Sequence, residues 1–208
     1  MGGLPDLREL RDDFLIGYRW LFGDRTMRAM SLSSWFMNFF GFGTYAILVP
    51  YLKRSFGATP QNIGVFFAIT AVGSIAGSLL AAKINDRWPF GRMIIVSFAL
   101  DALFFLPFPF VHSIWVAAVI WGCSNVGASF ELSQIIGWRM RITPQELIGR
   151  VIGCVRQFVL SGLIPGVLAM GWIADHVSGR AAMMSGAFGF LIVAAIFVCL
   201  PTIRREAR

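Results

Sequence analysis

Residues 62–82 read NIGVFFAITAVGSIAGSLLAA, a run without any Asp, Glu, Lys or Arg. Crossing a hydrocarbon layer about 30 Å thick takes about 20 apolar residues, because a helix rises about 1.5 Å per residue. Further stretches of similar length and character fill the chain. They lie at 29–50, 93–111, 114–137, 151–173 and 181–200. The sequence therefore predicts an all-α, polytopic membrane protein built as a bundle of six transmembrane helices.

The overall composition agrees with this fold class. Hydrophobic residues make up 57% of the 208 residues and charged residues only 14%, against about 25% charged in a typical soluble domain. The connecting segments are too short for a separate soluble domain. The predicted organisation is a linker helix at 1–28, the bundle at 29–200 and a basic tail at 201–208.

The distribution of basic residues predicts the orientation of the chain. If the N-terminus is cytoplasmic, the inside segments 1–28, 83–92, 139–150 and 201–208 hold 14 of the 18 Lys and Arg. Such an asymmetry is the positive-inside signal, which places both termini in the cytoplasm and the bundle in the inner membrane. Because the basic residues are sorted by loop, the net charge of +7 does not indicate a nucleic-acid partner.

Residues 1–28 predict an amphipathic helix that lies on the cytoplasmic membrane surface. Apolar residues recur there at helical spacing and charged residues take the other positions. The apolar positions are Leu7, Leu10, Phe14 and Leu21, with Trp20 as an interfacial anchor. This charged segment lacks the apolar core of a signal peptide, so we expect the first span to serve as the targeting signal.

No enzymatic chemistry is predicted. The sequence has no HExxH zinc motif, G-x-S-x-G elbow or Walker phosphate loop. Cys123, Cys154 and Cys199 each fall inside an apolar stretch, which indicates buried free thiols rather than disulfides or a metal site. We therefore expect no cofactor or metal, and an ion gradient or a partner protein as the energy source.

The linkers carry the most recognisable residues. Residues 139–151 read RMRITPQELIGRV, a segment that contains Arg139, Arg141, Pro144, Glu146, Gly149 and Arg150. This segment resembles the cytoplasmic loop between the fourth and fifth helices in the C-terminal half of major facilitator superfamily exporters, most of all macrolide efflux proteins and the enterobactin exporter. Residues 20–22, Asp86-Arg87, Gly91-Arg92 and Pro165-Gly166 extend the resemblance along the chain.

The resemblance implies only one half of a secondary transporter, because family members have two six-helix bundles. It implies export of lipophilic small molecules of the drug, macrolide or siderophore type, as in multidrug resistance, with protons as the coupling ion. The chain is then a fragment that lacks its N-terminal half, or two or more copies assemble. The competing hypothesis is a non-transporting remnant or a regulatory subunit that binds another transporter.

The loop at 83–92 departs from the superfamily pattern. In that pattern Gly follows the Asp-Arg pair after one residue, whereas here residues 88–90 separate Asp86-Arg87 from Gly91-Arg92. The resemblance implies that Asp86, Arg87 and Arg92 belong to a cytoplasmic gate. A purely topological role for the two arginines explains them equally well.

Three ionisable residues fall inside the predicted spans, namely Asp101, Glu131 and Arg156. A charge in hydrocarbon is costly, so each must face a cavity or a partner. Glu131 and Arg156 lie at similar depth on consecutive helices, which predicts an ion pair that is either a fixed clamp or a proton-sensitive latch. The resemblance places the fourth helix at the central cavity and the third outside it, and this favours Glu131 over Asp101 as the proton carrier.

Polar or small residues follow one face of three predicted spans. They are Ser34, Asn38, Gly41 and Tyr45 on the first, Ser124, Gly127, Glu131, Gln134 and Trp138 on the fourth, and Gln157 and Ser161 on the fifth. These faces predict a water-accessible substrate cavity, although hydrogen bonding between helices is the alternative. Aromatic residues near Asn38 and Tyr45 would suit lipophilic substrates, and lipid-facing packing explains most of the others.

Small residues and a proline mark two places for close packing or bending. Gly73 and Gly77 form a ridge on the second span that allows another helix to approach closely, either inside the bundle or in a second bundle. Pro165-Gly166 predicts a kink or pivot in the fifth span, because proline removes a helical hydrogen bond.

Overall fold

The computed structural model describes residues 7–23, 25–84 and 89–199, and within these ranges the chain is all helical. This confirms the predicted fold class. The helices are α1 (Leu7–Gly23), α2 (Arg25–Phe56), α3 (Pro60–Ile84), α4 (Phe90–Phe105), α5 (Ile114–Ile142), α6 (Ile148–Leu160), α7 (Leu163–His176) and α8 (Gly179–Cys199), with short 3₁₀ helices η1 (Phe108–Phe110) and η2 (Gln145–Leu147). The predicted tail at 201–208 lies outside the described residues.

Five described segments are long and apolar enough to cross a membrane. They are Arg25–Phe56, Pro60–Ile84, Phe90–Phe110, Gln145–His176 and Gly179–Ile196. The fourth predicted span, α5, is less apolar because polar residues follow one of its faces. Its 29 residues still extend about 44 Å, which exceeds the thickness of a hydrocarbon layer. The six predicted spans therefore have helical counterparts, with α6 and α7 together forming the fifth.

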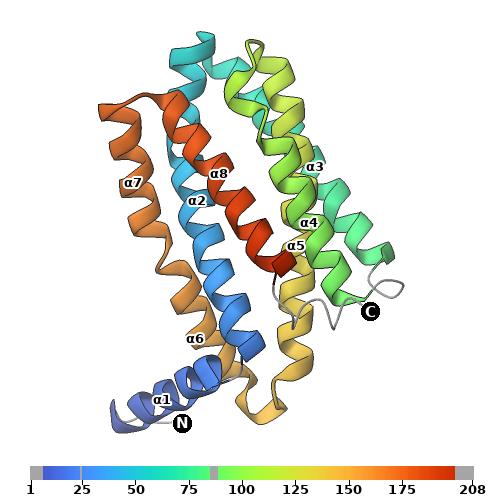
Figure 1. Ribbon diagram of the computed structural model, residues 1–208, viewed down its shortest axis with the longest axis vertical. Coiled ribbons are helices and arrows are strands. Elements are labelled where there is room, and N and C mark those ends of the chain that lie inside the picture. The colour runs from blue at the N-terminus through green and yellow to red at the C-terminus, as the bar shows by residue number, and fades with distance from the viewer. Residues whose placement is uncertain (1–6, 24, 85–88, 200–208) are drawn as a thin grey trace, which may run out of the picture.

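The long helices run side by side, and α1 lies across their lower end in Figure 1. One group consists of α5 packed against α3 and α4, and a second group consists of α2 packed against α7 and α8. Contacts between α4 and α8 join the two groups. The α5–α6 turn lies at the same end as α1, as the distribution of basic residues predicts. Which side of the membrane this end faces stays a prediction.

One side of helix α1 packs against the bundle, and apolar side chains on its other side are exposed. Gly17 lies against Cys154 and the Arg150 carbonyl of α6, and Leu21 is fully buried. The Cys154 thiol donates a hydrogen bond of 3.7 Å to the carbonyl oxygen of Phe14. Phe14 itself is exposed, so part of this helix remains available for the membrane surface.

The helix ends differ from several predicted boundaries, and the first span extends from Arg25 to Phe56 rather than from 29 to 50. The third span ends its α-helix at Phe105 rather than at Val111, because Pro107 and Pro109 have no N–H group with which to continue the helix. The fourth continues to Ile142, beyond the predicted Gly137.

The fifth predicted span is interrupted at Ser161 and Gly162, between α6 and α7. Pro165 explains this position, since a proline disrupts the hydrogen bond to the carbonyl four residues earlier, which belongs to Ser161. Gly162 and Gly166 lie against the backbone of α2 at Trp35 and Phe39. The glycines therefore allow α7 to approach α2 closely, and a pivoting motion at Pro165-Gly166 stays a prediction.

The glycine ridge of α3 packs inside the bundle. A Cβ atom at Gly73 would overlap the backbone of Gly122, and one at Gly77 would overlap the backbone of Val126, both on α5. Of the two alternatives for this ridge, the structure shows the internal contact. Close approach at these glycines brings α3 and α5 into van der Waals contact along the backbone.

We predict that Gly73→Ala destabilises the bundle, because the new methyl group meets the Gly122 backbone and overpacking costs about 1–3 kcal/mol. Thermal unfolding in detergent should show a lower midpoint than wild type. Gly64→Ala is the matched control, since a Cβ atom at this position of the same helix meets nothing. Equal midpoints for the two variants would contradict the internal role of the ridge.

Candidate functional site

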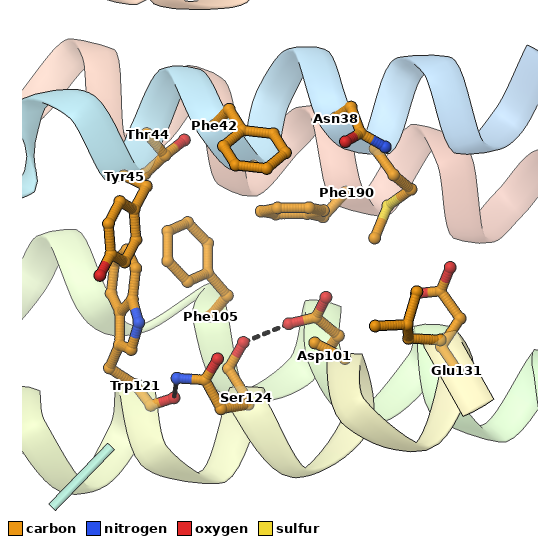
Figure 2. A pocket seen from close by; sticks show the side chains of 15 residues that line it. Asn38, Phe42, Thr44, Tyr45, Asp101, Phe105, Trp121, Ser124, Glu131 and Phe190 are labelled. Atoms are coloured by element: carbon orange, nitrogen blue, oxygen red, sulfur yellow. Dashed lines mark hydrogen bonds between the residues drawn. The ribbon is translucent and has the colours of Figure 1, made fainter. Parts of the chain in front are cut away.

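A cavity of about 370 Å³ lies between α2, α4, α5 and α8, and its volume falls within the range of small-molecule sites (Figure 2). Its lining is mostly apolar with a few polar groups. The lining residues are Met37, Asn38, Gly41, Phe42, Thr44, Tyr45, Asp101, Phe105, Trp121, Ser124, Asn125, Ala128, Glu131, Leu132 and Phe190.

Two buried acids line this cavity. Asp101 of α4 is 4% exposed and Glu131 of α5 is 7% exposed. Ser124 lies about two turns before Glu131 on the same face of α5. Its hydroxyl donates a hydrogen bond to Oδ1 of Asp101. Figure 2 shows both carboxyl groups pointing into the cavity, with Asn38 and Phe42 across from them on α2. The cavity therefore holds two groups that can gain or lose a proton.

Gly127 explains how Asp101 reaches the cavity. A Cβ atom at Gly127 would overlap the backbone oxygen of Ser97 and the backbone nitrogen of Asp101, so α4 and α5 touch at this level. The resemblance implies that the third span packs outside the central cavity, and in this structure Asp101 of α4 nevertheless lines the same cavity as Glu131. The preference for Glu131 over Asp101 as proton carrier therefore loses its geometric basis, since both acids line the same space.

The predicted pair between Glu131 and Arg156 does not form among the described residues. Arg156 is exposed on α6 and lines a different cavity. The cation whose charge acts on Glu131 is Arg139 of the same helix. Its Nη2 donates a hydrogen bond of 3.1 Å to Oγ of Ser34 on α2. Arg139 follows Glu131 by about two turns of the same helix, which brings the two side chains to neighbouring positions, whereas Arg156 lines the other cavity from α6.

The remaining predicted polar residues divide between the cavity and helix packing. Asn38 and Tyr45 of α2 line the cavity, and their contact with a substrate stays a prediction. Gln134 is buried on α5 but does not line it, and Gln157 is exposed. Ser161 accepts a hydrogen bond of 3.0 Å from Nε1 of Trp35. For Ser161 the structure shows the alternative role, a hydrogen bond between helices.

Several lining residues were missed by sequence reasoning. Phe105, Trp121 and Phe190 come from three different helices, and their rings pack edge to face, with centroids 5.1 Å apart for Phe105 and Trp121 and 5.4 Å for Phe105 and Phe190. No spacing along the chain connects these residues. Their shared surface arises only when α4, α5 and α8 pack together.

The described residues of the two predicted cytoplasmic loops, Arg139 apart, line neither cavity. Asp86 and Arg87 fall outside the described residues, and Arg92 is exposed at the start of α4. Thr143 ends α5 by donating a hydrogen bond of 2.7 Å to the carbonyl oxygen of Arg139. The exposed loop positions are Arg141, Pro144, Glu146, Gly149 and Arg150. Their proposed place in a cytoplasmic loop motif stays a prediction.

Comparison with known proteins identifies the family. Residues 32–208 match the model of the Major Facilitator Superfamily. The chain belongs to this superfamily. Membership confirms the predicted superfamily and indicates a multi-pass membrane protein.

Several superfamily proteins are similar in sequence. A probable 4-methylmuconolactone transporter of Cupriavidus pinatubonensis is 24% identical over 77% of this chain and 39% of its own length. A homologue of the multidrug resistance efflux pump PmrA from Lactococcus lactis is 22% identical over 64% of this chain and 33% of its own length. A maltose permease of Geobacillus stearothermophilus is 25% identical over 80% and 42%. The chain thus spans less than half the length of these relatives.

A solved structure supports the fold. A bacterial homologue of the human lysosomal transporter Spinster, in an inward-facing and unoccupied conformation, superposes with a TM-score of 0.70 and 16% identity. The match covers 99% of this chain and 53% of the other. The chain therefore has the fold of one half of a superfamily transporter.

We predict that the Ser124–Asp101 hydrogen bond stabilises the contact between α4 and α5. A double-mutant cycle of Ser124→Ala and Asp101→Asn, measured by chemical unfolding in detergent, should give a coupling free energy of about 1 kcal/mol. Ser133→Ala with Asp101→Asn is the matched control, because the Ser133 hydroxyl donates to the Ser129 carbonyl of its own helix. A coupling near zero for Ser124 would contradict the prediction.

Proposed function

We propose that this chain forms one six-helix half of a secondary active transporter that exports lipophilic small molecules in exchange for protons. The observation that supports this proposal is the aromatic cavity that holds the two buried acids, Asp101 and Glu131. An apolar wall suits a lipophilic substrate, and a few polar groups orient it. The proposed location is the inner membrane, with both termini in the cytoplasm.

The two acids supply the proton exchange in this proposal. Two carboxyl groups that share a low-dielectric cavity repel each other when both are ionised, so one proton is favoured on the pair. A positively charged substrate is attracted to the ionised carboxylates, and protonation of the pair weakens this attraction. Proton and substrate therefore compete for one cavity, which is the requirement for antiport. Glu131 has the cation Arg139 nearby to balance its ionised form.

A second bundle completes the transporter in this proposal. The relatives are more than twice as long as the segment that they share with this chain, and superfamily transporters work by rocking of one bundle against another around a central site. In this proposal the second bundle is an N-terminal half or a second copy of this chain. Phe36, Phe42 and Tyr45 of α2 are exposed near the cavity, and a second bundle would cover them.

The competing proposal is a non-transporting remnant or a regulatory subunit that assembles with another transporter bundle, and the exposed Phe36, Phe42 and Tyr45 of α2 would serve that assembly equally well. An upstream reading frame in phase with Met1 that encodes six further spans would support the fragment hypothesis. Homodimers of the purified chain that exchange substrate for protons in liposomes would support self-assembly. A chain that reaches the membrane, completes no transporter and alters the efflux of another protein would establish the regulatory role.

We predict that Glu131→Gln abolishes proton-coupled efflux in cells that carry the complete transporter, because the amide cannot exchange a proton. Ethidium, a lipophilic cation, is a suitable probe, and its efflux is followed by the loss of fluorescence from preloaded cells. Asp101→Asn should also lower efflux, since Asp101 shares the cavity.

Asp175→Asn is the matched control for this experiment. Asp175 is exposed near the end of α7 and does not line the cavity. The substitution also removes one carboxylate, but it should leave efflux unchanged. Immunoblotting should confirm equal amounts of each variant in the membrane. Normal ethidium efflux by Glu131→Gln would remove Glu131 from the proposed proton pathway.

A further inference from the structure

A second cavity, of about 430 Å³, adjoins the first and has the opposite charge. It lies between α5 and α6, and Asn38 of α2 and Leu132 of α5 line both cavities. Its apolar lining consists of Leu132, Ile136, Ile152, Val155, Val159 and Leu160. Its charged lining residues are Arg139 and Arg156, and no acidic residue lines it within the described part of the chain.

Arg139 has donor capacity that the fold leaves unused. Its Nη2 atom donates to Oγ of Ser34, but its buried Nε atom has no hydrogen-bond partner in the described residues. A buried donor without an acceptor costs about 1–3 kcal/mol. A guanidinium presents five N–H donors in a rigid plane, a geometry that matches a carboxylate or phosphate group.

Arg156 faces the same cavity from α6. Its side chain is exposed and makes no ion pair with another described residue. A guanidinium at membrane depth needs a counter-charge or water. The acid whose charge acts on Arg139 is Glu131, which faces the first cavity. Two cations therefore line an apolar cavity to whose lining the described residues contribute no acid.

We propose that Arg139 and Arg156 together bind the acidic head group of an amphiphilic organic anion, whose apolar body lies along the Ile136–Ile152 side of the cavity. The volume is that of a small-molecule site. An acidic head group would satisfy the free Nε donor of Arg139 and supply a counter-charge to both guanidinium groups. The anion is a soluble organic acid or an anionic phospholipid, because both combine an acidic head with an apolar body. This inference does not depend on the proposed antiport.

Equilibrium dialysis of the full chain in phosphatidylcholine nanodiscs tests the site. The probe is naphthalene-2-carboxylate, and naphthalene-2-carboxamide is its neutral counterpart of similar shape. After subtraction of binding to empty nanodiscs, the carboxylate should bind saturably and at least tenfold more tightly than the amide. Equal binding of the two compounds would overturn the proposal.

Variants assign the binding to the two arginines. Arg139→Gln/Arg156→Gln should lower carboxylate affinity to that of the amide. Arg156→Gln alone should lower it at least threefold, and this variant remains informative if the double variant does not fold, because the Arg156 side chain is exposed. Arg19→Gln/Arg25→Gln removes two exposed cations outside the cavity and should change nothing. An equal loss in this control would overturn the proposal.

A change of lipid identifies the source of the anion. Phosphatidylglycerol added to the nanodiscs should displace the probe from wild type, but not change the weak binding of Arg139→Gln/Arg156→Gln, if an anionic lipid is the occupant. Unchanged probe affinity in phosphatidylglycerol supports the same site with a soluble organic acid as its ligand.

Discussion

The cost of an unpaired charge inside a hydrocarbon layer decides where the polar side chains of this chain lie. A charged group at membrane depth must face water, a ligand or an opposite charge. Asp101, Glu131, Arg139 and Arg156 all line cavities, and only Arg156 of the four has an exposed side chain. The packing of the bundle therefore separates an apolar outer surface from an interior that tolerates ionisable groups.

Close backbone contacts make this interior possible. Gly73 and Gly77 allow α3 to approach α5, and Gly127 allows α4 to approach the same helix. As a result α5 packs against both α3 and α4, and its polar residues Ser124, Asn125 and Glu131 line the cavity that α2 also lines. Without the contact at Gly127, Asp101 would lie too far from the cavity to share it with Glu131.

The adjoining cavities differ in charge, although they share Asn38 and Leu132. The first holds two acids and an aromatic wall, and the second holds two arginines and an aliphatic wall. Glu131 and Arg139 lie on one helix between them, and their charges interact.

The sequence by itself determined the fold class, the approximate position of the six spans, and the presence of Asn38, Tyr45, Ser124 and Glu131 on cavity-facing surfaces. These features follow from local periodicity and from the length of a helix that crosses a bilayer. Only the tertiary structure decided that Asp101 joins Glu131, that Arg156 belongs to a separate cavity, and that Phe105, Trp121 and Phe190 form one wall. These relations depend on the rotation and spacing of helices far apart in the chain, which backbone contacts such as that at Gly127 set and which no spacing within one helix encodes.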